Sequence, residues 1–377
     1  MSQFDLKRAK IKKIFDLAPV AGNPRNSEGD FLPLNDGRIL FVWSKFTGDS
    51  SADHASASIY SYILNSDGEQ ISEERCLVSQ EDDSALNIMS LSLLRMQNGD
   101  IGLFYFLRRA KDDGRLWLRR SSDEGLSFKN AVPCTTGKGY YVTNNDRVLR
   151  LQSGRLIVPA AYHRVINVKY DGQVREAWDG RSSSYFFYSD DDGETWCEGN
   201  PCTLNARYSA SGLQEPGAIE FKPDCLYGWA RTDMGCQFEM FSMDGGENWS
   251  EAVPSKFTAP CSPLSIKQDI KGRYFAIWNP IPEYVGRPAI PNFWNGGRTP
   301  LVIACTDGRG RFGEAFVLED AEDAGFCYTA MLPTDKGFLL SYCAGQKSLG
   351  DANTLVRLRV SSISMKELDK IADAFGK

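Results

Sequence analysis

The sequence predicts an all-β protein, a six-bladed β-propeller of four-stranded antiparallel blades with short helical segments at its termini. Two periodic features of the 377 residues lead to this prediction. A turn motif built on Asp and Gly recurs along the chain, and a series of six β-hairpins runs out of phase with it. Both series repeat at intervals of roughly 50–70 residues, the length of one four-stranded blade with its loops.

The first series is the turn motif Ser-x-Asp-x-Gly followed, two residues later, by an aromatic residue. Three well-formed copies contain Asp123, Asp191 and Asp244, and degenerate copies surround Asp67 and Asp307. The five aspartates lie 56, 68, 53 and 63 residues apart. Asp and Gly at fixed offsets favour a tight turn between strands. We therefore interpret the copies as structural turns and not as ligand sites.

The second series consists of an apolar strand, a polar turn and a second apolar strand, the pattern of a β-hairpin. Six segments fit it: LPLNDGRILFVW, LLRMQNGDIGLFYF, VLRLQSGRLIVPAAY, IEFKPDCLYGWAR, IKQDIKGRYFAIW and MLPTDKGFLLSYC. Their turns lie near Gly37, Gly99, Gly154, Cys225, Gly272 and Gly337. Six hairpins imply six blades. Because a propeller cannot close with a blade missing, we expect a single domain over residues 1–377.

Two terminal segments fall outside the repeat. We expect residues 1–20 to form an N-terminal extension that is helical over residues 6–17, with the basic run 7–13 on its solvated face. Residues 364–377 are expected to form a C-terminal helix, because Leu368, Ile371, Ala372 and Phe375 share one helical face.

Composition excludes several classes of function. The net charge of −6 and the lack of a long basic stripe argue against nucleic-acid binding. Two histidines and no Cys-x-x-Cys pair argue against a zinc site, so we expect neither a metal nor an organic cofactor. The ten cysteines occur singly, and no apolar run resembles a secretory signal or a membrane span. We therefore expect a cytoplasmic protein with reduced thiols and no membrane partner.

Candidate ligand-binding residues follow from the propeller itself. Its innermost strands line a central channel, and the loops that enter them form one mouth, a concave place of the kind where ligands bind. Positions about ten residues before each hairpin turn should face this mouth. In chain order they are Arg25, the 88–90 region, Asn145, Glu215, the 262–263 region and Tyr328. An arginine, a glutamate and a tyrosine from three blades are therefore expected to converge.

The Asp motifs resemble the Asp boxes of the sialidase (neuraminidase) superfamily, whose members use three arginines, a Tyr–Glu pair and an aspartate. The resemblance covers about residues 20–360, and its motifs come in the family's chain order. QEPGAIEF and LYGWART imply Glu215 and Arg231, and GGRTPLVIACTDG implies Arg298. GFCYTAML implies Tyr328, and DHASASI implies Asp53.

The resemblance implies a retaining exo-glycosidase that releases terminal sialic acid, or a related acidic sugar, from a glycoconjugate. Arg25, Arg231 and Arg298 would bind the sugar carboxylate, because a guanidinium presents a planar fork of donors. Tyr328 would be the nucleophile. A phenol has a pKa of ~10, so it needs an adjacent base, and Glu215 is the candidate. Asp53 would be the acid that protonates the leaving oxygen, with Asp49 in the same loop as the alternative.

One match departs from the family. The first arginine of sialidases lies in an Arg-Ile-Pro context, whereas Arg25 lies in PRNSEGDF, where Glu28 and Asp30 add two acids. Two other interpretations therefore stay open: a sialidase-fold hydrolase for a different sugar, and a non-catalytic carbohydrate-binding propeller. The enzyme interpretation requires Tyr328 and Glu215 within about 4 Å, and a binding module does not.

Overall fold

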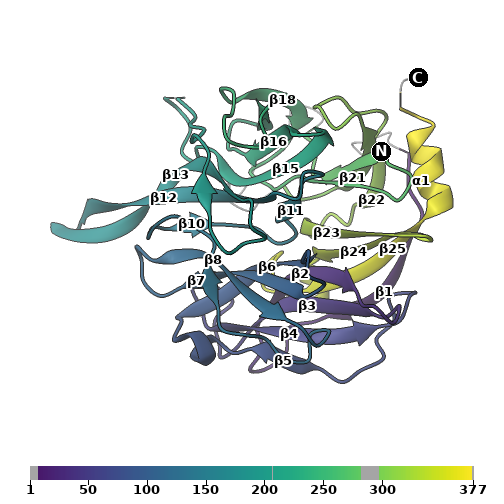
Figure 1. Cartoon of the computed structure of the whole chain (residues 1–377), viewed down its shortest axis with the longest axis horizontal. Coiled ribbons are helices and arrows are strands. Elements are labelled where there is room, and N and C mark those ends of the chain that lie inside the picture. The colour runs from purple at the N-terminus through teal and green to yellow at the C-terminus, as the bar shows by residue number, and fades with distance from the viewer. Residues whose placement is uncertain (1–6, 206, 282–296, 376–377) are drawn as a thin grey trace.

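The computed structural model describes residues 7–205, 207–281 and 297–375. They form six antiparallel sheets that follow one another along the chain, and the predicted six-bladed β-propeller is confirmed (Figure 1). Blade 1 comprises β2 (Asn26–Pro33), β3 (Ile39–Phe46), β4 (Ala57–Leu64) and β5 (Arg75–Val78). Blade 2 comprises β6 (Asn87–Arg95), β7 (Ile101–Arg108), β8 (Gly114–Ser121) and β9 (Val132–Pro133). Blade 3 comprises β10 (Tyr141–Val142), β11 (Leu149–Arg150), β12 (Leu156–Tyr170), β13 (Gln173–Ser189) and β14 (Cys197–Glu198).

The remaining blades follow the same order. Blade 4 comprises β15 (Gln214–Lys222), β16 (Cys225–Arg231), β17 (Cys236–Ser242) and β18 (Val253–Thr258). Blade 5 comprises β19 (Ser265–Gln268), β20 (Tyr274–Trp278), β21 (Leu301–Thr306) and β22 (Phe316–Glu319). Blade 6 comprises β23 (Cys327–Thr334), β24 (Gly337–Cys343), β25 (Leu358–Ser364) and, as its outer strand, β1 (Ile11–Leu17).

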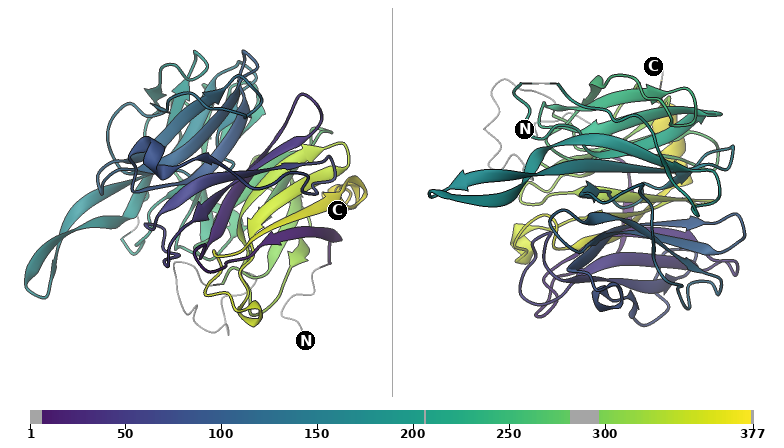
Figure 2. Two further views of the ribbon diagram at one scale, coloured as in Figure 1. Left: turned by 90° about the horizontal axis from the view of Figure 1, so that it is seen from below. Right: turned by 60° about the vertical axis from the view of Figure 1, so that its left-hand side comes forward.

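Each predicted hairpin forms the first two strands of one blade, so the hairpin series located all six blades. Blade 3 differs in one detail, because its inner strand is divided into β10 and β11, which both pair with β12. The second hairpin of this blade, β12 with β13, is much longer than the others and extends beyond the body of the propeller (Figure 2).

The N-terminal helix expected over residues 6–17 is wrong, because this segment contains strand β1. It pairs antiparallel with β25, placing Ile11 opposite Ile363 and Leu17 opposite Leu358. An unpaired β25 would expose a row of backbone donors and acceptors, and pairing with β1 satisfies them. Strands from the two ends of the chain thus share blade 6, which closes the ring.

The C-terminal helix is confirmed but is shorter than expected. Helix α1 (Met365–Ala372) begins at Ser364, whose side chain accepts a hydrogen bond of 3.3 Å from the backbone N–H of Glu367. Leu368 and Ile371 are buried against blades 5 and 6. Two short 3₁₀ turns, at Gln80–Asp83 and Lys347–Leu349, complete the helical content of the described residues. Within those residues, none of the helices has both the length and the apolar character needed to cross a bilayer.

The hydrophobic core lies between the blades. Six clusters of buried side chains each join two consecutive blades, including the pair formed by blades 6 and 1. Phe41 and Trp43 of blade 1, for example, pack in one cluster with Leu339 and Val360 of blade 6. This packing of sheet face on sheet face holds the inner strands around one axis.

The Asp boxes connect the third and fourth strands of their blades, as expected for structural turns. In the copy at Asp123, one carboxylate oxygen accepts hydrogen bonds from Ser121 Oγ at 2.7 Å and from the Ser127 N–H at 2.8 Å. The other carboxylate oxygen accepts from Ser127 Oγ at 2.6 Å. Successive antiparallel strands alternate in direction, so these turns and the inner hairpin turns share one end of the propeller. Loops entering the inner strands therefore lie at the opposite end.

Candidate active site

The six residues implied by the sialidase resemblance all lie at the end of the propeller opposite the Asp boxes. Arg25 directly precedes β2, and Asp53 lies in the loop between β3 and β4. Glu215 and Arg231 come from the start of β15 and the end of β16. Arg298 precedes β21, and Tyr328 is the second residue of β23. Four different blades therefore supply the side chains of one site.

Tyr328, Glu215 and Arg231 form a hydrogen-bonded triad. The phenol Oη of Tyr328 donates to Glu215 Oε1 at 2.8 Å. Arg231 Nη1 donates to Glu215 Oε2 at 2.6 Å and to the phenol oxygen of Tyr328 at 3.2 Å. Arg231 is 5% exposed and Tyr328 is 9% exposed, so these contacts are screened from water.

The surroundings push the pKa values of Tyr328 and Glu215 apart. Burial and the charge of Glu215 raise the pKa of Tyr328 well above its usual value, against the opposing effect of Arg231 and Arg298. Burial also opposes ionisation of Glu215, but Arg231, Arg298 and the Tyr328 hydrogen bond outweigh it and lower its pKa. The pair thus rests as a neutral phenol beside an ionised carboxylate, the arrangement a general base requires.

Arg298 lies against the same tyrosine. Its guanidinium carbon is 5.4 Å from the centre of the Tyr328 ring. Its Nη1 donates to the sulfur of Cys327 at 3.1 Å, and Arg231 Nε donates to the sulfur of Cys261 at the same distance. Both arginines are therefore oriented by buried thiols, a role for Cys261 and Cys327 that the sequence did not suggest.

Arg25 is held by groups of the protein on every side. Its Nε donates to Ser27 Oγ at 2.9 Å, and its Nη1 donates to the Ser51 carbonyl at 3.2 Å and to Asp53 Oδ1 at 2.5 Å. Its Nη2 donates to Glu28 Oε1 at 3.0 Å. The guanidinium also stacks over Phe46, 4.4 Å from the ring centre. Four donor interactions of this 1% exposed arginine are thus already in use.

The loop between β3 and β4 holds both candidate acids. Asp53 reaches Arg25 and yet leaves 74% of its side chain exposed. Partial loss of hydration at the channel mouth opposes ionisation of Asp53, but the charges of Arg25, Arg298 and Arg231 outweigh it, so the pKa of Asp53 is lowered. Asp49 is exposed in the same loop. The ion pair to Arg25 therefore distinguishes Asp53 from Asp49.

Near the mouth, five of the described blades carry a residue in the left-handed backbone region, four of them on the inner strand and one between β10 and β11. These residues are Glu28 (φ 55°), Ser90 (φ 52°), Asp146 (φ 54°), Glu215 (φ 46°) and Tyr328 (φ 58°). In blades 1, 2, 4 and 6 the strand pairing shifts at this residue, which marks a β-bulge. Bulges re-aim side chains, and left-handed non-glycine residues are strained, so both features cluster at functional sites.

The bulges correct one sequence prediction and reveal a residue it missed. Arg25 is not the equivalent of Glu215 and Tyr328, because Glu28 occupies that place in blade 1. Glu28 lies nine residues before Gly37, just as Tyr328 lies nine residues before Gly337. The offset of nine that holds for Tyr328 and for Ser90 before Gly99 would have identified Glu28.

Asn145 connects the inner strands across the channel. Its side-chain amide donates to the carbonyl of Gly29 at 2.8 Å and to the carbonyl of Tyr328 at 3.1 Å. Asn145 comes from blade 3, whereas its two partners come from blades 1 and 6. The side chain therefore fixes the left-handed backbone of Tyr328 from the opposite wall.

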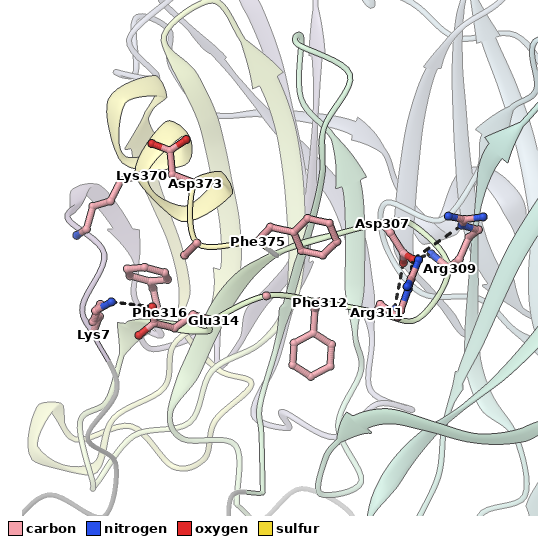
Figure 3. A pocket seen from close by; sticks show the side chains of 12 residues that line it. Lys7, Asp307, Arg309, Arg311, Phe312, Glu314, Phe316, Lys370, Asp373 and Phe375 are labelled. Atoms are coloured by element: carbon pink, nitrogen blue, oxygen red, sulfur yellow. Dashed lines mark hydrogen bonds and ion pairs between the residues drawn. The ribbon is translucent and has the colours of Figure 1, made fainter. Parts of the chain in front are cut away.

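A separate groove of about 1220 Å³ lies at the outer rim, between α1 and the β21–β22 connection (Figure 3). Phe312, Phe316 and Phe375 line it together with charged side chains, among them Lys7 paired with Glu314. None of the six implied site residues belongs to its lining.

Comparison with known families agrees with this architecture. The model of the BNR repeat-like domain matches residues 26–340. The chain belongs to the BNR repeat-like domain family. The predicted resemblance to Asp-box propellers is therefore confirmed at the level of this family.

More specific matches are partial or distant. An anhydrosialidase of Macrobdella decora is 31% identical over 115 residues, which cover 29% of the chain and 14% of that protein. A solved structure of a protein of unknown function from Dyadobacter fermentans has a TM-score of 0.66 at 14% identity, covering 94% of this chain and 99% of the other. The Hadza microbial sialidase Hz136 has a TM-score of 0.67 at 15% identity, covering 92% of this chain and 66% of the other. At these identities the structural matches show the fold.

Proposed function

We propose that this BNR-repeat propeller is a retaining exo-glycosidase that releases a terminal sialic acid, or a related acidic sugar, from glycoconjugates. The observation that carries the proposal is the 2.8 Å hydrogen bond from Tyr328 to Glu215, with Arg231 in contact with both. A binding module has no need of a buried phenol paired with an ionised carboxylate.

In the first step, the phenol oxygen of Tyr328 bonds to the anomeric carbon while the bond to the leaving oxygen breaks. Glu215 takes the phenol proton, since its Oε1 already accepts that hydrogen bond. A neutral nucleophile suits this carbon, because the adjacent sugar carboxylate would repel an attacking aspartate or glutamate. Sialidases with a tyrosine nucleophile are a known exception to the two-carboxylate rule.

Asp53 supplies the proton for the leaving oxygen. In the structure it is paired with Arg25, which helps to keep its pKa low. A substrate carboxylate that binds Arg25 Nη1 displaces Asp53 from that cation, and loss of the ion pair raises its pKa. In the second step the oxygen of a water molecule bonds to the anomeric carbon while the bond from Tyr328 breaks. Asp53 takes a proton from that water, and Glu215 returns its proton to the Tyr328 oxygen.

Arg231 and Arg298 bind the sugar carboxylate from the Tyr328 side, and Arg25 binds it from blade 1. Guanidinium groups in a site screened from water give both orientation and affinity for a carboxylate. The anion-binding part of the site is thus made of three blades around the nucleophile.

A second candidate function differs in the group that accepts the sugar in the second step. The partial match to an anhydrosialidase favours transfer of the sugar to one of its own hydroxyl groups, in place of water. Both routes share the first step and the residues described above, and they differ only in the product.

The test is incubation of the wild-type protein with an α-linked N-acetylneuraminyl glycoside between pH 4 and 8. The released sugar is then identified by mass spectrometry. Free acidic sugar supports the hydrolase, and a product lighter by one water supports intramolecular transfer. A parallel panel of neutral glycosides is the control. Cleavage of a neutral sugar in preference to the sialoside would reject the proposed substrate.

A further inference from the structure

Among the described residues, the three guanidinium groups predicted to bind the sugar face three carboxylates. Arg25, Arg231 and Arg298 face Glu28, Asp53 and Glu215, and the ion pairs Arg25–Glu28, Arg25–Asp53 and Arg231–Glu215 connect them. An acidic sugar adds a fourth negative charge to this balanced set. Burying an uncompensated charge is costly, so one of the acids has to leave or take up a proton.

Glu28 is the acid that cannot leave. Its side chain is 4% exposed, and the left-handed backbone of the β2 bulge directs it at Arg25. Its Oε1 accepts from Arg25 Nη2 at 3.0 Å, and its Oε2 accepts from Ser90 Oγ of blade 2. By contrast, Asp53 is 74% exposed on a loop, so once displaced from Arg25 its pKa rises only toward the ordinary value of a hydrated aspartate, about 3.9, and its carboxylate stays mostly ionised in water between pH 5 and 8.

The charged and titratable groups around Glu28 come from several blades. Arg25 is its ion-pair partner, and Asp53 lies on the other side of that guanidinium. Glu215 of β15 adds further negative charge, and Tyr328 of β23 and Cys343 of β24 also interact with Glu28. Arg25 is therefore the main cation available to Glu28, and Asp53 already shares it.

We propose that Glu28 makes ligand recognition proton-linked: the carboxylate of an acidic sugar binds at Arg25 together with one proton, which Glu28 takes up. This inference rests on the proposed function. It makes Glu28 a specificity-determining residue, because a protonated Glu28 leaves a full positive charge on Arg25 for the ligand. A neutral sugar at the same place would require no proton.

The titration behaviour of Glu28 agrees with this role. Burial, partly offset by Arg25 and Ser90, raises the pKa of Glu28 to about 7. A ligand carboxylate beside it raises the pKa further. Glu28 is thus ionised in the free protein above about pH 7 and protonated in the complex, so affinity should fall about tenfold per pH unit above that value.

The experiment is titration calorimetry of the wild type and Glu28→Gln from pH 5 to 8. The probe is an uncleavable 2,3-unsaturated analogue of N-acetylneuraminic acid, and each titration is repeated in two buffers of different ionisation enthalpy. Gln keeps the size of the side chain and its capacity to bond Arg25 and Ser90. We expect uptake of nearly one proton at pH 8 by the wild type and none by Glu28→Gln, whose affinity should stay level over this range.

Two controls sharpen the result. The methyl ester of the analogue carries no charge and should bind without proton uptake. Ser90→Ala removes a hydrogen bond that lowers the pKa of Glu28, so it should move the fall in affinity to higher pH. Absence of proton uptake in the wild type, or equal uptake in Glu28→Gln, would overturn the inference while leaving the proposed function intact. Failure of both folded proteins to bind the analogue at any pH would instead overturn the proposed function, and this inference with it.

Discussion

Tyr328 and Glu215 share a 2.8 Å hydrogen bond although 113 residues separate them in the sequence. Each stands on a left-handed bulge at the start of an inner strand, one in blade 6 and the other in blade 4. The same left-handed bulge, present in both blades, thus brings a phenol and a carboxylate together at the channel mouth. Strain of this kind persists only where the surrounding structure enforces it.

Replacing Glu215 by Gln should remove the base without emptying the site. We expect kcat to fall about 10²- to 10⁴-fold, the usual contribution of a general base. Gln still accepts from Arg231, so the thermal midpoint should change far less than in Glu215→Ala. The latter removes the carboxylate that is ion-paired with the buried Arg231, and breaking a buried ion pair costs about 3–5 kcal/mol. Equal kcat in wild type and Glu215→Gln would contradict the role of base.

Asp53→Asn and Asp49→Asn form a matched pair that separates the two candidate acids of one loop. With a poor alkyl leaving group, Asp53→Asn should lower kcat about 10²-fold, because the departing oxygen is no longer protonated. With a nitrophenyl leaving group the loss should be much smaller. Asp49→Asn should resemble the wild type on both substrates. The reverse ranking would assign the acid to Asp49.

Asn145 is expected to act as a positioning residue. Asn145→Ala removes two donors from buried carbonyls, and misplacement of Tyr328 should lower kcat by up to about 10²-fold with little change in KM. Asn145→Asp should be more damaging, since a carboxylate would face the carbonyls of Gly29 and Tyr328. Steady-state kinetics with the thermal midpoint of each variant checks this ranking. A variant that loses stability but keeps its kcat would show a structural role alone.

The Asp boxes should make stability depend on acid pH. Hydrogen bonds from Ser127 and Ser121 lower the pKa of Asp123 to about 2, and bonds from Thr195 and Ser189 do the same for Asp191. The unfolded pKa is about 3.9, so their stabilisation is complete above about pH 4 and is lost as pH falls through about 2. Urea unfolding at pH 2–5 should show a shallower pH dependence for Asp123→Asn/Asp191→Asn than for wild type. An unchanged slope would contradict this origin.

Much of the propeller could be predicted from the sequence because its signals are local. Each inner hairpin carries its own apolar strands and turn, and each Asp box closes on itself through Ser, Asp and Gly within five residues. The N-terminal segment was misassigned because its partner, β25, lies more than 300 residues away. The N-terminal segment forms a strand because it pairs with the open edge of β25, and the local sequence contains no sign of that distant edge.

The sequence predicted a site residue only where a chemically distinctive side chain also lay at the expected distance from a hairpin turn. Glu215 and Tyr328 stand at the bulge position and were found by counting back from the turns. Glu28 stands there too, but the sequence pattern predicts Arg25, three residues earlier, as the equivalent residue. The contacts of Cys261, Cys327 and Asn145 depend on side chains that cross between blades, which spacing along one chain does not reveal.

The most direct test of the central claim compares wild type with Tyr328→Phe on a fluorogenic α-linked N-acetylneuraminic acid substrate. The proposed mechanism predicts turnover by the wild type and a loss of about 10³-fold or more in Tyr328→Phe. The variant should still bind the uncleavable analogue, since Arg231 and Arg298 remain. Full turnover by Tyr328→Phe would contradict the account.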